Sequence, residues 1–203
     1  MARNSNSCHL TFASSLIINP LSSMKMISMI LGVLALALFA FVGVGLYKAA
    51  DLRTIRIVKT VTIQSSIEDV FGMVKYLNNF PKWSPFLAQD PSQQYKVVGV
   101  DGTPGAQYHW EGNGGKDLGY QEIVKIEENR FVAMKCDIKK PFEAKPTFEY
   151  YFTETADGIE VEQVFKLESK RIEAFFMWLF RAKSEMESTN QQGLNLLKKA
   201  TEQ

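Results

Sequence analysis

Residue types that could carry acid–base chemistry are scarce in this sequence. Two histidines occur, His9 and His109, and the second lies two residues before Glu111. Residues two apart on a β-strand share a face, so His109 and Glu111 would form an acid–base pair if that face lined a cavity. The neighbouring Tyr108 and Trp110 make the opposite face the apolar one. We therefore expect the histidine and the glutamate to point toward solvent and to take no part in catalysis.

The other candidates for nucleophilic or metal chemistry have structural explanations. Ser84 lies in a Trp-Ser-Pro sequence without the small-residue elbow of a hydrolase nucleophile, which favours a turn residue or helix cap. Cys136 falls beside Met134 and Ile138 in an alternating run, so we expect an inert core thiol. The glycine-rich stretch 112–119 lacks the P-loop arrangement and is typical of a hairpin loop. Because HxxxH and Cys-x-x-Cys spacings are missing, the sequence predicts no metal site and no cofactor.

Length and charge restrict the classes of function. The 203 residues, 46% of them hydrophobic, suffice for one globular domain with a sizeable core. The 23 Lys and Arg residues nearly balance 22 Asp and Glu residues, which argues against a nucleic-acid ligand. The two cysteines, Cys8 and Cys136, flank the most apolar segment of the chain, so we expect no disulfide between them.

That apolar segment, residues 26–47, has no charged residue and is bracketed by Lys25 and Lys48. As a helix it would extend about 33 Å, close to the roughly 30 Å of a bilayer's hydrocarbon core. A cleavable signal peptide is the nearest alternative, but its apolar region is usually shorter, and here Lys48 occupies the −3 position of a potential Ala-Ala cleavage site. We therefore expect a single-pass membrane protein with an uncleaved transmembrane helix over 26–47. Which side of the membrane the domain occupies stays open.

The flanking segments complete the predicted organisation. Residues 1–25 are rich in Ser and Asn and predict a disordered tail, 48–54 form a linker, and 55–203 form the folded domain. Within this domain, residues 55–63 alternate and are β-branched, as in a strand, and a helix of about thirteen residues follows. Its predicted start is a capping box formed by Ser65 and Glu68.

Period-two alternation between about Tyr95 and Leu167 predicts an antiparallel sheet with one covered face. A helical stretch over about 170–200 would cover that face, which makes the domain α+β. Eight residues, mostly aromatic, alternate with charged ones and are predicted to line a ligand-binding cavity under the helix, although a filled core satisfies the same pattern. They are Tyr108, Trp110, Met134, Phe148, Tyr150, Phe152, Gln163 and Phe165.

Four segments resemble a known family. They are VTIQSSIEDVFGMVKYLNNFPKWSPF (61–86), GAQYHWEGN (105–113), GYQEIVKIEENRFV (119–132) and the terminal GLNLLKKA. They resemble the SRPBCC or START-like superfamily, and within it the polyketide cyclase/dehydrase-like proteins. The resemblance implies a helix-grip fold, a curved antiparallel sheet around a long C-terminal helix, here preceded by one transmembrane helix. It also implies a mostly apolar cavity that binds lipids, sterols, polyketides or other hydrophobic molecules.

We therefore expect a membrane-tethered module that binds a hydrophobic small molecule or lipid. One alternative is a cyclase or dehydratase that uses Tyr108, Tyr150 and Gln163 on the cavity wall to position its substrate. The other is a regulatory module that binds another protein. The absence of a catalytic constellation favours the binding module over the enzyme.

A run of bulky apolar residues at 175–180 covers more than one helical face. The helical period groups Ile172, Phe175, Phe176 and Leu179 in one stripe and leaves Met177 and Trp178 pointing away. An exposed Trp beside basic residues is typical of a membrane interface, so we predict that this segment contacts the membrane, through Trp178, or lines the ligand entrance. The alternative is that Trp178 packs under a loop of the same domain. Leu194 and Leu197 are predicted to lie at the buried end of the same helix.

Overall fold

The structure is a computed structural model that describes residues 20–202, so the predicted tail (1–25) lies mostly outside the described residues. The chain divides into two compact units, residues 1–43 and 44–203. Helix α1 (Pro20–Lys48) contains the apolar segment. Among the described residues it provides one helix near the N-terminus that is long and apolar enough to cross a membrane, a property that a signal sequence shares.

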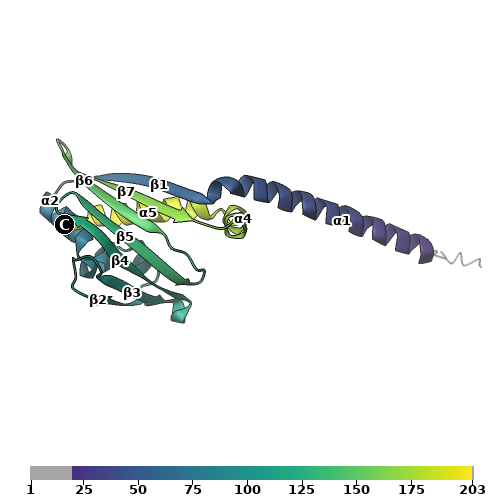
Figure 1. Cartoon of the computed structure of the whole chain (residues 1–203), viewed down its shortest axis with the longest axis horizontal. Helices are drawn as coiled ribbons and strands as arrows, with labels where there is room; N and C mark the ends of the chain where they lie inside the picture. Colours follow the sequence, from purple (N-terminus) through teal and green to yellow (C-terminus); the bar gives the residue numbers. More distant parts are fainter. Residues whose placement is uncertain (1–19, 203) are drawn as a thin grey trace, which may run out of the picture. The chain divides into compact units, whose positions relative to one another are not determined.

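A seven-stranded antiparallel sheet dominates the second unit (Figure 1). Its strands follow the spatial order β1-β7-β6-β5-β4-β3-β2, in which the first strand pairs with the last. They are β1 (Thr54–Ile63), β2 (Gln94–Val98), β3 (Gln107–Gly112), β4 (Asp117–Glu127), β5 (Phe131–Lys140), β6 (Thr147–Thr155) and β7 (Gly158–Glu168). The helical elements after α1 are η1 (Ala49–Leu52), α2 (Ile67–Lys75), η2 (Leu77–Lys82), α3 (Pro85–Gln89), η3 (Asn113–Gly115), α4 (Arg171–Leu179) and α5 (Ala182–Thr201).

Two serines begin the short helices between β1 and β2. The Ser66 hydroxyl accepts a hydrogen bond from the Asp69 amide (3.1 Å) and caps α2, so the predicted capping box was placed one residue too early. Ser84 caps α3 in the same way, through the Leu87 amide (3.2 Å), with Pro85 at the first helical position. This arrangement confirms the prediction that Ser84 is a helix cap.

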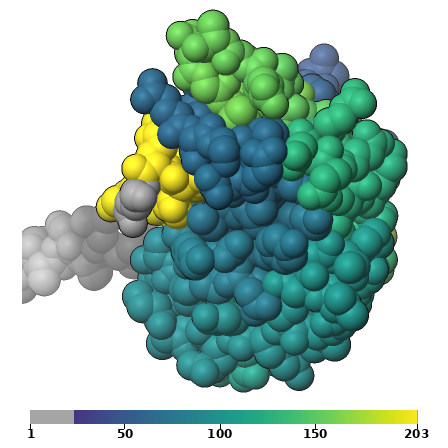
Figure 2. Space-filling model, turned by 90° about the vertical axis from the view of Figure 1, so that its left-hand side faces the viewer, coloured from purple at the N-terminus to yellow at the C-terminus, as the bar shows by residue number. Residues whose placement is uncertain are grey.

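The C-terminal helical stretch is broken, contrary to the single helix predicted over 170–200. Helix α4 ends at Leu179 and α5 begins at Ala182, because Arg181 adopts a left-handed backbone conformation (φ 54°). α5 then packs along the sheet (Figure 1). Its last turn is fastened to β1 because the Lys198 ammonium donates to the Thr62 carbonyl (2.8 Å). In Figure 2 this end of α5, in yellow, lies beside the blue segment that contains β1 and α2.

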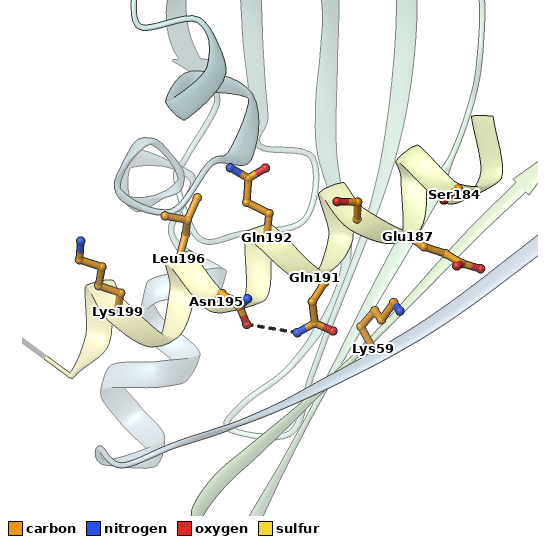
Figure 3. A pocket seen from close by; sticks show the side chains of 9 residues that line it. Lys59, Ser184, Glu187, Gln191, Gln192, Asn195, Leu196 and Lys199 are labelled. Carbon is orange, nitrogen blue, oxygen red and sulfur yellow. Dashed lines mark hydrogen bonds between the residues drawn. The ribbon is translucent and has the colours of Figure 1, made fainter. Parts of the chain in front are cut away.

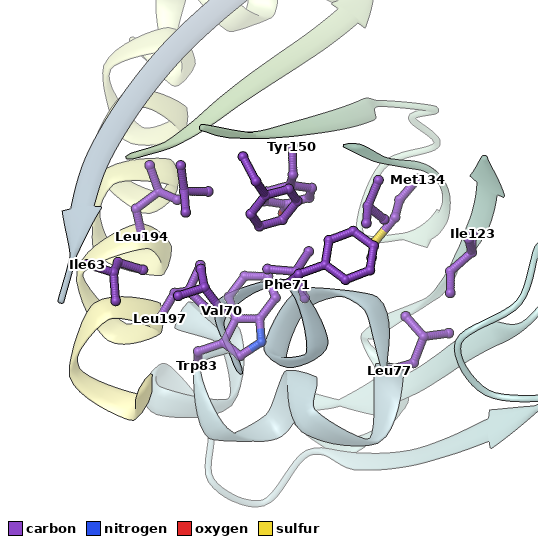
Figure 4. Close-up of a cluster of buried hydrophobic side chains, with 14 of the residues drawn as sticks. Ile63, Val70, Phe71, Leu77, Trp83, Ile123, Met134, Tyr150, Leu194 and Leu197 are labelled. Atoms are coloured by element: carbon purple, nitrogen blue, oxygen red, sulfur yellow. The ribbon is translucent and has the colours of Figure 1, made fainter. Parts of the chain in front are cut away.

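The main core lies between the sheet, α2 and the C-terminal half of α5 (Figure 4). Phe71 of α2 is central to it and meets Phe152 of β6 edge-on, with ring centroids 5.3 Å apart. Leu194 and Leu197 are fully buried in the same cluster, which confirms their predicted burial. A curved antiparallel sheet that grips a long C-terminal helix is the helix-grip α+β fold expected from the sequence.

Candidate functional site

A largely apolar cavity of about 560 Å³ lies between the inner face of the sheet, α3 and the N-terminal half of α5. This volume is within the range of small-molecule sites in proteins. Six of the eight residues predicted to form the wall line it. They are Tyr108, Trp110, Phe148, Tyr150, Gln163 and Phe165.

The other two predicted wall residues, Met134 and Phe152, do not line the cavity. Both belong to the main core, where Phe152 meets Phe71 and Met134 lies near the same ring (Figure 4). The physical reason is that α2 and α5 both lie over the inner face of the sheet. Helix α2 fills the space over one part of that face, whereas the cavity lies under the N-terminal half of α5. Alternation assigns a residue to a face of the sheet and leaves open what covers that residue.

The rim of the cavity consists of residues that the sequence analysis missed. Phe86 of α3, Pro141 and Phe142 of the β5–β6 turn, and Glu185 of α5 all line the cavity while being exposed. Phe142 is 78% accessible, which is unusual for a phenylalanine. We infer that the cavity opens between these residues. An aromatic residue beside proline in a polar turn was the sequence signal for this opening.

Two polar arrangements lie within the apolar wall. The Gln163 amide donates to the Tyr150 hydroxyl (2.9 Å) from the neighbouring strand. The Trp110 indole donates to the Asp117 carboxylate (3.0 Å), which also accepts from Gln93 (3.4 Å). These bonds fix the orientation of two aromatic rings that face the cavity.

Burial keeps two tyrosine hydroxyls and the cysteine thiol of the wall neutral. It raises the pKa of the Tyr108 and Tyr150 hydroxyls well above the usual value, and it raises the pKa of the Cys136 thiol to about 12. A thiol with so high a pKa is a poor nucleophile at neutral pH. Cys136 is thus buried and inert, as expected, although it lines the cavity.

Alkylation should reveal this protection. At pH 8 we expect Cys136 of the folded full-length chain to react with iodoacetamide at least about a hundredfold more slowly than an exposed thiol, because both its thiolate fraction and its accessibility are low. The rate should rise with pH as the thiolate forms, and it should become normal in denaturant. Peptide mass spectrometry measures the modified fraction. Rapid labelling of the native protein at pH 8 would contradict the assignment.

His109 lies outside the cavity, as predicted. Its ring stacks on Tyr120 (centroids 5.2 Å apart), and its Nε2 hydrogen-bonds with Gln107 Oε1 (2.8 Å). Burial, and next the charge of Lys96, lower the pKa of the imidazole, which favours its neutral form. Glu111 is exposed on the same strand. The two side chains therefore do not face the candidate site.

A second hollow lies between β1 and the outer face of α5 (Figure 3). Its walls are polar, with Lys59, Glu187, Gln191 and Asn195 among them, and the Gln191 amide donates to Asn195 Oδ1 (3.2 Å). It offers little apolar surface to a ligand. Within residues 20–202, no cluster of three His, Cys, Asp or Glu side chains could hold a metal ion.

The exposed face of α4 differs from the predicted one. Trp178 is half-buried and lies close to Gly45, where an added Cβ would come within 2.8 Å of the indole. Met177 packs against the small core cluster around Phe165 and Leu167. The reason is that residues 44–52 pack against the side of α4 that carries Trp178, a side that the helical period predicted to be exposed. The apolar residues that α4 and its end expose are Ile172, Phe176, Leu179 and Phe180.

Comparisons with known proteins agree with this architecture. The family model described as "Polyketide cyclase / dehydrase and lipid transport" matches residues 54–202. A solved protein from Chromobacterium violaceum superposes with a TM-score of 0.54 at 14% identity, covering 74% of this chain and 99% of that one. The Aha1 dimer from Colwellia psychrerythraea gives 0.51 at 15% identity, with 73% and 96% covered. Curated protein sequences give no match.

A further solved structure is the di-domain ARO/CYC StfQ from the steffimycin biosynthetic pathway. It superposes with a TM-score of 0.56 at 12% identity, and the match covers 77% of this chain and 53% of StfQ. At identities this low, each of these structures shows a likeness of fold alone.

Proposed function

Because the chain belongs to the polyketide cyclase/dehydrase and lipid transport family, of the SRPBCC type, we propose that its cavity binds one hydrophobic small molecule or lipid. The observation that carries the proposal is the aromatic cavity of about 560 Å³ with exposed Phe86 and Phe142 at its rim. Apolar surface that remains unfilled inside a fold stabilises a ligand that covers it.

Binding of 1-aminoanthracene, a neutral fluorescent probe, tests this proposal. The full-length chain in phosphatidylcholine nanodiscs should enhance and saturate the probe's emission after subtraction of the signal from empty nanodiscs. The proposal fails if the protein adds no saturable signal.

A binding role is favoured over catalysis by the chemistry of the wall. The tyrosines and Cys136 are neutral at pH 7, and Asp117 is held by Trp110 and Gln93. General acid–base catalysis works best with a group whose pKa lies near the working pH. Among the described residues that line the cavity, Glu185 is the other acid, and it stands exposed at the rim.

A cyclase-like enzyme is the second candidate, favoured by the buried pair of Tyr150 and Gln163 in the wall. Such a pair could fold and orient a flexible chain without a strong base. Tyr150→Phe separates the two functions. An enzyme would lose turnover of a polyketide-like substrate while its affinity for 1-aminoanthracene persists, whereas a carrier has no turnover to lose.

We further propose that α1 tethers the domain to a membrane. Its apolar side chains are exposed along the helix, which water does not favour and a bilayer does. We expect the mature protein to keep residues 26–47, to stay with the membrane pellet at pH 11, and to be released by detergent. Intact-mass analysis checks the first point, and an intact mass that lacks the segment identifies a signal sequence instead.

We also propose that α4 lies on the bilayer surface. Helix α4 packs against residues 49–52, which follow the apolar segment closely in the sequence. Both belong to the same compact unit. Arg171 and Arg181 lie at the two ends of α4, and Lys48 and Arg53 lie at the two ends of η1. All four are exposed and would meet anionic headgroups. Trp178, half-buried between α4 and Gly45, would then contribute by fixing α4 and would lie at the level of the interface.

An environment-sensitive label tests this contact in the full-length chain. With Cys8 and Cys136 replaced by Ser, we expect a nitrobenzoxadiazole label at Phe180→Cys to shift to the blue in nanodiscs and to be quenched by brominated lipid. The matched control is Glu68→Cys, an exposed site on α2, which lies at the opposite end of the domain from α4 (Figure 1). Equal quenching at the two sites contradicts the contact.

A further inference from the structure

We propose that the ligand is a neutral apolar molecule that carries hydroxyl or carbonyl oxygens, and that fatty acids and other anions are rejected. This inference rests on the proposed function, since it specifies the chemistry of the molecule in the same cavity. It follows from the polar atoms and charges of the wall.

Three buried side-chain atoms lack a hydrogen-bond partner within the described part of the chain, and all three belong to residues that line the cavity. They are Tyr108 OH, Gln121 Nε2 and Gln163 Oε1. The residues are 1%, 7% and 4% exposed, respectively. Buried polar atoms in native proteins are nearly always hydrogen-bonded, so three such atoms around one cavity point to partners on a bound molecule.

The three atoms are grouped on two parts of the wall. Tyr108 and Gln121 are direct cross-strand neighbours on β3 and β4. Gln163 pairs in the same way with Tyr150 on β7 and β6. β5 and β6 lie between Gln121 on β4 and Gln163 on β7, so these two residues are three strand spacings apart along the sheet, about 14 Å. A ligand that satisfies both groups therefore bears oxygens at two separate places on an apolar skeleton.

The type of each atom specifies what the ligand must offer. The Gln121 amide nitrogen is a donor and needs an oxygen acceptor, such as a carbonyl or a hydroxyl. Gln163 Oε1 is an acceptor and needs a donor such as a hydroxyl, since its amide nitrogen already binds Tyr150. The Tyr108 hydroxyl can donate or accept. Neutral hydroxyl and carbonyl groups can supply all three partners.

The charges of the wall exclude an anionic ligand. The charged residues that line the cavity are Asp117 and Glu185, and neither Lys nor Arg is among the lining residues that the structure describes. A buried carboxylate or phosphate without a cation is strongly disfavoured, more so beside two acids. The cavity therefore differs from one built to hold a fatty acid by its carboxylate.

Three probes of similar apolar character but different polar groups distinguish these ligands. They are testosterone, with one hydroxyl and one carbonyl, 5α-androstane, the same skeleton without oxygen, and lauric acid. Each is titrated against bound 1-aminoanthracene with the full-length chain in phosphatidylcholine nanodiscs, corrected for partition into empty nanodiscs. We expect testosterone to displace the fluorophore with at least about tenfold higher affinity than androstane or laurate.

Two variants assign this preference to the wall. Gln121→Leu and Gln163→Leu remove a polar group without an obvious change in size, and each should lower the affinity for testosterone about tenfold. Affinity for androstane should not fall, because each leucine removes a polar atom that the hydrocarbon leaves unpaired, and continued saturable binding of 1-aminoanthracene shows that the cavity is intact. The matched control is Gln94→Leu on the exposed face of β2, which should change none of these affinities.

The failures of the two proposals are distinguishable. If androstane or laurate binds as tightly as testosterone, or if neither leucine variant alters selectivity, the inference is overturned while the cavity remains a ligand site. If 1-aminoanthracene shows no saturable binding, the proposed function fails and the inference with it.

Discussion

Filling the cavity is expected to lower the affinity for 1-aminoanthracene by about a hundredfold or more. The double variant Cys136→Phe/Thr189→Trp adds two aromatic rings, one from β5 and one from α5, and both positions line the cavity. Rings that occupy the ligand's volume exclude it sterically, while the added apolar contacts replace those that the ligand would make. Titration of the probe with the full-length chain in nanodiscs measures the change.

The control for this variant is Ser188→Trp. Ser188 precedes Thr189 on α5 but lines the second hollow, the polar one between β1 and the outer face of this helix. An indole at this site should leave the affinity unchanged. The prediction is wrong if Ser188→Trp weakens binding of 1-aminoanthracene as much as the double variant does. It is also wrong if the double variant is as stable as the wild-type chain, judged by its melting temperature, and still binds 1-aminoanthracene with the same affinity.

The second large effect is on stability. Phe71→Ala is expected to lower the free energy of unfolding by about 3–5 kcal/mol, because the phenyl ring is 1% exposed and fills the space between α2 and β6. The emission of Trp83 reports the loss, since this indole is buried in the same core and donates to the Met73 carbonyl (3.0 Å). Urea unfolding of the nanodisc-bound chain provides the measurement.

Phe86→Ala is the matched substitution at the rim of the cavity. Phe86 is 47% exposed, so its loss should cost less than about 1 kcal/mol of unfolding free energy. The free energy of binding 1-aminoanthracene should weaken by more than the free energy of unfolding falls, because the ring lines the cavity. Equal destabilisation by the two substitutions would mean that Phe71 does not anchor the core as described.

Local patterns predicted most of the fold because each depends on a short-range rule. Alternation placed β1 within one residue of its observed start, and the apolar run anticipated α1. The broken C-terminal helix was missed, since a left-handed arginine gives no compositional signal and the apolar period continues across it. The exposed face of α4 was also missed, because it depends on residues 44–52, which come from far along the chain and pack against this helix.

The candidate site was predicted less completely, for a physical reason. Strand residues such as Tyr150 and Gln163 were found because their face follows from period two. The rim residues and the α5 wall depend on how loops and helices meet the sheet, which no local pattern specifies. Gln121 was missed because a polar residue in a strand is usually solvated, and its lack of a partner becomes visible only when the neighbouring strands are in place.

Native mass spectrometry of the full-length chain, released from the membranes in which it was made, tests the central claim most directly. We expect a protein that carries one neutral lipophilic molecule with at least one oxygen, and a Cys136→Phe/Thr189→Trp variant that is folded but carries none. Extraction and accurate mass of the released compound identify its class. A wild-type chain and a filled variant with the same bound molecules, or a wild-type chain that is empty and takes up no probe, would contradict it.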